Sequence, residues 1–136
     1  MSTLIIYYSY SGNTRKIAEA LAVEKAADLT AINDEKRPGK FKAYSSGCLK
    51  ALNGQGWAIQ PLTVDLGAYD EIILLTPIWA GNVPPAVNSA LELLPAGKEV
   101  SIKAVSGSGS SKCVDKLRAV VEGKGSTLAA FEDIKS

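Results

Sequence analysis

A cluster of hydroxyl and amide side chains around one glycine could hold a phosphate group. The segment Ser9-Tyr10-Ser11-Gly12-Asn13-Thr14 follows a short apolar run and precedes a helical pattern. Free backbone N–H groups and the helix dipole favour an anion at a helix N-terminus, and hydroxyls can satisfy further phosphate oxygens. The segment lacks the Gly-Lys-Ser/Thr ending of a Walker A loop, and its single glycine does not make a dinucleotide fingerprint. An ordinary polar turn with a good helix cap is the alternative interpretation.

A second segment could hold a flat ring. Pro77-Ile78-Trp79-Ala80-Gly81 follows a wholly apolar run, and Pro84 and Pro85 stiffen the chain beyond it. An indole on a stiff loop can stack on an aromatic ligand, and such pairs gain about 0.5–1.5 kcal/mol beyond area burial. The alternative is a tryptophan that packs over the end of a sheet. The chain's other tryptophan, Trp57, could cover a ligand, but we expect it to pack on the sheet edge.

A third segment, Ser106-Gly107-Ser108-Gly109, follows another apolar run. It could offer backbone N–H and C=O groups to the edge of a heterocycle. A flexible connector is the alternative that its composition favours.

Alternating strands and helices must position these three loops. The alternation predicts a parallel sheet with crossover helices. Apolar runs predict strands over 4–8, 28–33, 71–75, 100–105 and 127–134. Helical spacing predicts a helix from Asn13 or Thr14 and helices over 86–94 and 113–122. The segment 34–56 is the hardest to assign, and a helix over 41–52 is one interpretation of it.

The composition narrows the possible chemistry. The chain has 136 residues, enough for one domain with a proper core, and a net charge of +1. This balance provides no strong field for nucleic acid or an anionic membrane, so we expect neither as a partner. Histidine is absent, which excludes Ser-His-Asp catalysis and histidine-ligated metals. Cys48 and Cys113 lack metal-ligand spacing, and two thiols without a secretory signal or membrane span predict a soluble cytoplasmic protein.

Together these features resemble the flavodoxin family over nearly the whole chain. The segment from Ile5 to Thr14 is similar to the family's FMN-phosphate motif. Tyr69-Asp70, the following apolar strand and the segment from Pro77 to Gly81 resemble its third strand and isoalloxazine segment. The resemblance implies one doubly wound domain over residues 1–136, with a five-stranded parallel sheet of order 2-1-3-4-5. In flavodoxins, which are the standard example of the rule, the ligand binds where strands one and three diverge.

The resemblance also implies a non-covalent FMN and a role for each loop. Four side chains would hold the phosphate, together with the backbone of Tyr10 and Gly12: Ser9, Ser11, Asn13 and Thr14. Trp79 would stack on the ring, and the backbone of Ile78, Ala80 and Gly81 would lie near its redox-active edge. The backbone of the segment 106–109 would lie near its pyrimidine edge.

The sequence departs from the flavodoxin pattern in three ways. Residues 106–112 contain no aromatic side chain to sandwich the ring, so one ring face is expected to be open. The chain is not acidic, whereas low-potential carriers of this family usually are. The family's last helix is absent, so the polar side of the fourth strand, with Ser101 and Lys103, is expected either to be solvated or to pair with a second copy in a homodimer.

Three functions remain open at this stage. The first is an electron-transfer protein that docks on redox partner proteins, with FMN as the redox group. The second is an enzyme in which NAD(P)H reduces quinones or nitro-compounds, small electron acceptors that could stack on an open flavin face. The third is a non-redox module that uses the same crevice for another anion or for a protein partner.

Overall fold

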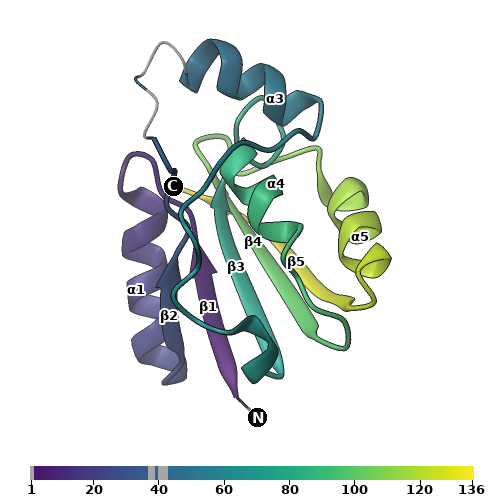
Figure 1. Ribbon diagram of the computed structural model, residues 1–136. Coiled ribbons are helices and arrows are strands. Elements are labelled where there is room, and N and C mark those ends of the chain that lie inside the picture. The colour runs from purple at the N-terminus through teal and green to yellow at the C-terminus, as the bar shows by residue number, and fades with distance from the viewer. Residues whose placement is uncertain (1, 37–38, 40–42) are drawn as a thin grey trace.

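A five-stranded parallel sheet forms the centre of the computed structural model, which describes residues 2–36, 39 and 43–136. The strands lie in the order β2-β1-β3-β4-β5 (Figure 1). Their bounds are Thr3–Tyr7 for β1, Asp28–Ala31 for β2, Glu71–Pro77 for β3, Glu99–Ser106 for β4 and Thr127–Lys135 for β5. The predicted flavodoxin-like α/β fold and strand order are therefore confirmed.

Helices cover both faces of this sheet. The helix α1 (Asn13–Lys25) packs on β1, β2 and β3, while α4 (Pro85–Leu91) and α5 (Val114–Gly123) lie on the opposite face (Figure 1). A π-helical turn, η1 (Ala43–Gly47), leads into α3 (Cys48–Leu52) at the top of Figure 1, above the ends of the strands. The 3-10 turn η2 (Leu66–Ala68) precedes β3.

The central strands are apolar throughout because both of their faces are buried. Side chains alternate between the two faces of a strand. Leu4 and Ile6 therefore enter the core under α4 and α5, while Ile5 enters the core under α1. In β3, Ile72 and Leu74 enter the core under α4 and α5, and Ile73 and Leu75 enter the core under α1. This double burial explains the continuous apolar runs in the sequence.

The part of β4 and β5 on the α1 side carries no helix among the described residues. Ser101 and Lys103 lie on this side and are half-buried. Lys103 Nζ pairs with Glu132 Oε1 of β5 at 2.7 Å. The last helix or strand among the described residues is β5 itself. Pairing of this side with a second copy stays a prediction.

Several predicted boundaries were wrong by a few residues. The second strand ends at Ala31 rather than at 33, because Asn33 and Glu35 pair with the segment 58–60 instead. The third extends from 75 to Pro77. The helix predicted over 86–94 ends at Leu91, because Pro95 has no N–H to donate to the carbonyl four residues before it and its ring would clash with that carbonyl in a continuing helix. Of the helix proposed over 41–52, residues 43–52 form η1 and α3, and 41 and 42 lie outside the described residues.

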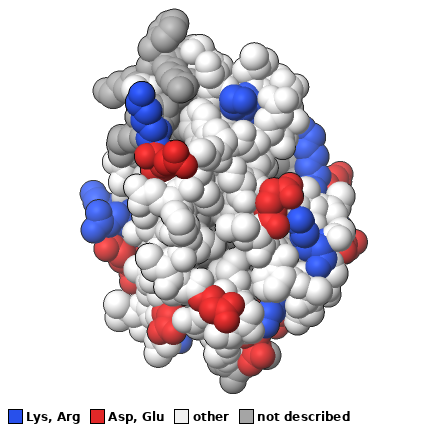
Figure 2. Space-filling model, viewed as in Figure 1, with Lys and Arg blue, Asp and Glu red and all other residues white. Residues whose placement is uncertain are grey.

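No described helix is long and apolar enough to span a lipid bilayer. Lys and Arg side chains are interspersed with Asp and Glu side chains on the face that Figure 2 shows. This face therefore presents no large field of one sign to a partner.

Candidate functional site

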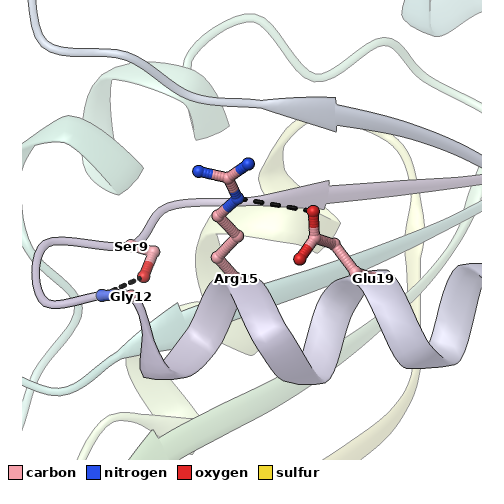
Figure 3. A network of polar contacts seen from close by, with 4 residues as sticks. All are labelled: Ser9, Gly12, Arg15 and Glu19. Carbon is pink, nitrogen blue, oxygen red and sulfur yellow. Dashed lines mark hydrogen bonds and ion pairs between the residues drawn. The ribbon is translucent and has the colours of Figure 1, made fainter.

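The loop between β1 and α1 forms an open cradle at a helix N-terminus. Gly12 has a φ of 102°, a left-handed conformation that favours glycine. Its N–H donates to Ser9 Oγ at 3.0 Å (Figure 3). Among the described residues, no side chain caps the first turn of α1, and no atom lies within 4 Å of where a Cβ on Gly12 would stand. Uncapped N–H groups beside open space and hydroxyls are a donor set that fits a phosphate.

The predicted phosphate ligands differ in their exposure. Ser11 and Asn13 are exposed and Ser9 is half-buried, but Thr14 is only 3% exposed. Ser11 and Asn13 are therefore more accessible to a ligand than Thr14.

Arg15 is a cation beside the cradle that was not among the predicted site residues. It lies on the first turn of α1, and its Nε lies 3.4 Å from Glu19 Oε2 (Figure 3). This exposed pair contributes little stability, so the guanidinium is available to a nearby anion.

A tight turn after β3 presents the predicted ring-binding tryptophan. Trp79 and Asn82 exchange backbone hydrogen bonds of 2.7 and 3.0 Å. Ala80 and Gly81 between them have φ values of 53° and 80°, as a type I′ turn requires. The Asn82 side chain donates to the carbonyl of Ala80 at 3.2 Å. The turn is thus pinned by backbone and side-chain bonds, which holds the indole at the end of β3.

Among the residues whose side chains the structure describes, three aromatic rings surround Trp79 edge-on. The ring centroids of Tyr8 and Trp57 each lie 6.1 Å from it, and that of Tyr10 lies 5.8 Å away. A Cβ built on Gly47 would stand 2.7 Å from Trp79 Cζ3 and 3.3 Å from Trp57 Cη2. We call Tyr8, Tyr10, Trp57 and Trp79 the aromatic cluster. Trp79 is half-buried in it, so its indole is part of the core as well as a candidate platform.

Asp34 ties two members of this cluster together. Its carboxylate accepts hydrogen bonds from the hydroxyl of Tyr8 at 2.7 Å and from Trp57 Nε1 at 2.8 Å. Neither Tyr8 nor Asp34 is among the site residues predicted from the sequence, and Trp57 is predicted there only to pack on the sheet edge. The signal that could have found Tyr8 is its place at the end of the first apolar run, directly before the polar loop.

The third loop is bonded to itself and to its neighbours. Ser106 Oγ accepts from the N–H of Gly109 at 3.0 Å, and Gly109, with a φ of 74°, packs against Lys135. The N–H of Lys112 donates to the carbonyl of Gly81 at 2.9 Å. The loop is therefore attached to the tryptophan turn and to the end of β5.

The structure brings the three predicted loops to the carboxyl edge of the sheet. Tyr10 of the first loop touches Trp79 of the second, and Gly81 of the second bonds to Lys112, just after the third. A cavity of about 380 Å³ opens beside Ser9, between the ends of β1 and β2. It is lined by Tyr8, Ser9, Ile32, Asn33, Asp34 and Gln60. This clustering places every predicted site residue in one region, and their role as ligands stays a prediction.

Neither cysteine belongs to these loops. Cys113 is 1% exposed, and burial raises the pKa of its thiol, while a hydrogen bond involving Ser111 acts in the opposite direction. Cys48 is half-buried in α3. The described residues contain no group of His, Cys, Asp and Glu side chains that could hold a metal ion.

Comparison with known proteins identifies the family of the chain. The family described as NADPH-dependent FMN reductase matches residues 1–129. The chain belongs to this family. Members of the family are FMN-binding flavoproteins, so the resemblance to FMN proteins of flavodoxin-like fold is confirmed, and FMN is the cofactor that this membership assigns.

Solved structures of this fold include two forms of one flavoprotein from Lactobacillus acidophilus. Its complex with FMN is 24% identical, with a TM-score of 0.80, over 96% of this chain and 91% of that one. Its apo-form is 28% identical, with a TM-score of 0.70, over 97% and 92%. Oxidised flavodoxin 2 from Bacillus cereus is 21% identical, with a TM-score of 0.60, over 99% and 84%.

A relative from Archaeoglobus fulgidus, described as an uncharacterized protein, is 31% identical over 96 residues. The match covers 71% of this chain and 60% of that protein's length. The chain thus spans about three-fifths of this relative, which carries no activity across to it.

Proposed function

We propose that the chain is an FMN-dependent oxidoreductase that takes electrons from a reduced nicotinamide cofactor and passes them to a small acceptor such as a quinone or a nitro-compound. One contact supports the proposal. The loop at residues 9–14, here called the phosphate cradle, meets the turn at residues 79–82, here called the tryptophan turn, through Tyr10 and Trp79, whose ring centroids lie 5.8 Å apart. A phosphate site and a ring platform then lie within one ligand's reach. The family match supports the choice of FMN as that ligand.

The residues present fit the cofactor's chemistry. The first turn of α1, with Ser9, Ser11 and Asn13, would hold the phosphate, because uncapped N–H groups and hydroxyls meet there beside open space. Trp79 would lie against the ring, and the backbone of residues 106–109 would lie at its polar edge. Bound FMN supplies the redox chemistry, and the protein supplies binding, orientation and electrostatics.

The third loop favours a substrate-reducing enzyme. Residues 106–112 contain no aromatic side chain, and serine hydroxyls and glycines close the loop on itself. No indole or phenol from this loop would cover the outer face of a bound ring. A flat acceptor could therefore stack on that face, as direct reduction requires.

An electron carrier that docks on partner proteins is the second candidate. The fold shared with flavodoxin 2 of Bacillus cereus favours it. The chain has a net charge of only +1, and both signs of charge are interspersed on the face that Figure 2 shows. This balance gives little of the single-sign field that steers a carrier to an oppositely charged partner, which places this candidate second.

Flavin titration tests the shared part of the proposal. FMN and riboflavin are added separately to the apoprotein while flavin fluorescence is followed. We expect FMN to be strongly quenched and to bind at least about tenfold more tightly than riboflavin, since charge-assisted hydrogen bonds hold the phosphate. Equal affinity for both flavins would contradict the phosphate cradle, and no binding of either would contradict the proposed function.

NADPH oxidation then separates the two candidates. The FMN-loaded protein is mixed with NADPH and a quinone, without any partner reductase. Rapid NADPH consumption that depends on the quinone supports the enzyme. If NADPH is consumed only after a flavodoxin reductase is added, the carrier is the correct assignment.

A further inference from the structure

One carboxylate holds two of the three described aromatic rings that surround Trp79. Asp34 Oδ2 accepts from the hydroxyl of Tyr8 at 2.7 Å, and Asp34 Oδ1 accepts from Trp57 Nε1 at 2.8 Å. Both rings meet Trp79 at the same separation of 6.1 Å and at the same interplanar angle of 71°. Each oxygen of the carboxylate therefore sets the position of one edge-on neighbour of the indole.

A carboxylate suits this position because it only accepts hydrogen bonds. An indole N–H only donates, and a phenol hydroxyl donates readily, so two donors converge on one charged acceptor. Hydrogen bonds to an ionised acceptor are shorter and stronger than neutral ones. They restrict the two rings more firmly than packing alone would.

The backbone around Asp34 is also held in place. The N–H of Gln60 donates to the carbonyl of Asn33 at 2.8 Å, and the N–H of Glu35 donates to that of Ala58 at 3.1 Å. These bonds bring the segment 33–35 beside the segment 58–60, directly after Trp57. The carboxylate thus stands on a paired backbone at the end of β2, and the rings are oriented from a fixed point.

We propose that Asp34 is a positioning residue for the flavin ring: it holds Tyr8 and Trp57 against Trp79 and thereby fixes the indole that the ring lies against. Gly47 already blocks one side of Trp79, since a Cβ there would stand 2.7 Å from the indole. With Asp34 intact, Gly47 and the edge-on neighbours hold the half-buried indole in place. Without Asp34, two of those neighbours lose their anchor. This inference rests on the proposed function, because it assumes that FMN binds at Trp79.

Two substitutions of Asp34 separate geometry from charge. In Asp34→Asn, the amide oxygen can accept from Trp57 Nε1, and the amide N–H₂ can donate to the hydroxyl of Tyr8, which also accepts. Both anchors then persist without the charge. Asp34→Ala removes both. We expect Asp34→Ala to weaken FMN binding about tenfold and Asp34→Asn to stay within about threefold of the wild type.

Tyr8→Phe and Asp65→Ala complete the set. Tyr8→Phe deletes one anchor and keeps the ring, so it tests the proposal even where Asp34→Ala does not fold. Asp65→Ala is the matched control, because Asp65 is an exposed carboxylate that accepts from the N–H of Gly67 at 2.9 Å in η2. We expect Asp65→Ala to bind FMN like the wild type.

The experiment combines FMN titration with near-ultraviolet circular dichroism of the apoprotein, which reports how the aromatic cluster is ordered. Loss of the tryptophan bands and of FMN affinity in Asp34→Ala, with both retained in Asp34→Asn, supports the proposal. Wild-type affinity in Asp34→Ala, or an equal loss in Asp34→Asn, overturns it. If the wild-type protein binds no FMN, the proposed function fails. Unchanged bands in Asp34→Ala then show separately that Asp34 does not order the rings.

Discussion

The backbone of Gly47 lies directly against the indole of Trp79, so close that a Cβ on Gly47 would stand 2.7 Å from Cζ3 of the ring. The same Cβ would stand 3.3 Å from Cη2 of Trp57. Gly47 has ordinary helical backbone angles, φ −66° and ψ −46°, so its conformation does not demand glycine. Glycine is needed there for space. This contact joins η1 and α3 to the candidate ring site.

Gly47→Ala is expected to lower the free energy of unfolding by about 1–3 kcal/mol, the usual cost of overpacking a core. The methyl group must displace Trp79, because the helical backbone itself accepts alanine. Urea denaturation followed by tryptophan fluorescence measures the change. The matched control is Gly123→Ala at the end of α5, where nothing lies within 4 Å of the added Cβ. Equal stability of the two variants would show that the Gly47 contact is not tight.

Gly12→Ala tests the phosphate cradle. A φ of 102° is strained for alanine, so we expect a loss of about 1–2 kcal/mol in stability and weaker FMN binding. Gly54→Ala is the control, because Gly54 also has a positive φ, 68°, and open space around its Cβ position. Titration with FMN and with riboflavin measures the difference. FMN affinity should fall only in Gly12→Ala, and riboflavin affinity should hold in both variants; an equal fall for the two flavins would point away from the phosphate.

The thiol of Cys113 should be unreactive in the folded protein. It is 1% exposed, and burial raises its pKa above the ordinary value, so little thiolate forms near neutral pH. A disulfide reagent that releases a coloured thiolate measures this at mildly alkaline pH. We expect Cys48 to react first and Cys113 to react only after urea is added. Equally fast modification of Cys113 in the native protein would contradict its burial.

The same raised pKa makes stability depend on pH. The folded state disfavours the Cys113 thiolate, so the neutral thiol contributes to the free energy of unfolding. This contribution is fully present below the unfolded pKa of about 8.5 and is lost as the pH rises through the higher folded pKa. Denaturation of Cys113→Ala should show a shallower decline over this alkaline range than the wild type.

Tyr69 should titrate above the usual range for tyrosine. Its hydroxyl donates to Asp28 Oδ2 at 2.6 Å, and that hydrogen bond is the main cause of the raised pKa, with desolvation and the negative charge of Asp28 adding to it. The neutral phenol is favoured in the folded state, so the stability from this contact is present below the ordinary tyrosine pKa and is lost as the pH rises through the folded one. Absorbance titration of Asp28→Ala, which removes both the acceptor and the charge, should show one tyrosine returning toward its ordinary pKa, and an unchanged curve would contradict the assignment.

The order of the strands and the grouping of the loops could be predicted from the sequence. Ile5 and Ile73 stand in runs that are apolar on both faces, which only a covered parallel sheet needs. Given the strand order, ligands are expected to bind where strands one and three diverge, and this rule placed Gly12 and Trp79 together at the carboxyl edge of the sheet. The alternating pattern predicted the parallel sheet, whereas the strand order itself was implied by the resemblance to the flavodoxin family.

The bonds that organise the aromatic cluster could not be predicted. Asp34 lies 26 residues from Tyr8 and 23 from Trp57, in a segment without clear periodicity. No local spacing connects a carboxylate to rings so far away along the chain. The contact of Gly47 with Trp79 likewise depends on where η1 and α3 lie above the sheet, which is a tertiary matter. These long-range contacts arise from packing rather than from any motif.

The two faces of the sheet bury unequal cores, and this difference sets which part of the molecule opens first. Beneath α1 the fully buried apolar residues are few: Ile5, Ala18, Ile73 and Leu75. The opposite face buries many more, beneath α4 and α5. Segments with few buried contacts exchange their amide hydrogens through local opening, so α1 should exchange faster than the strands beneath it. The phosphate cradle lies at the N-terminus of α1. An anion bound there would slow amide exchange in α1, because a ligand that binds only the closed form shifts the equilibrium toward that form.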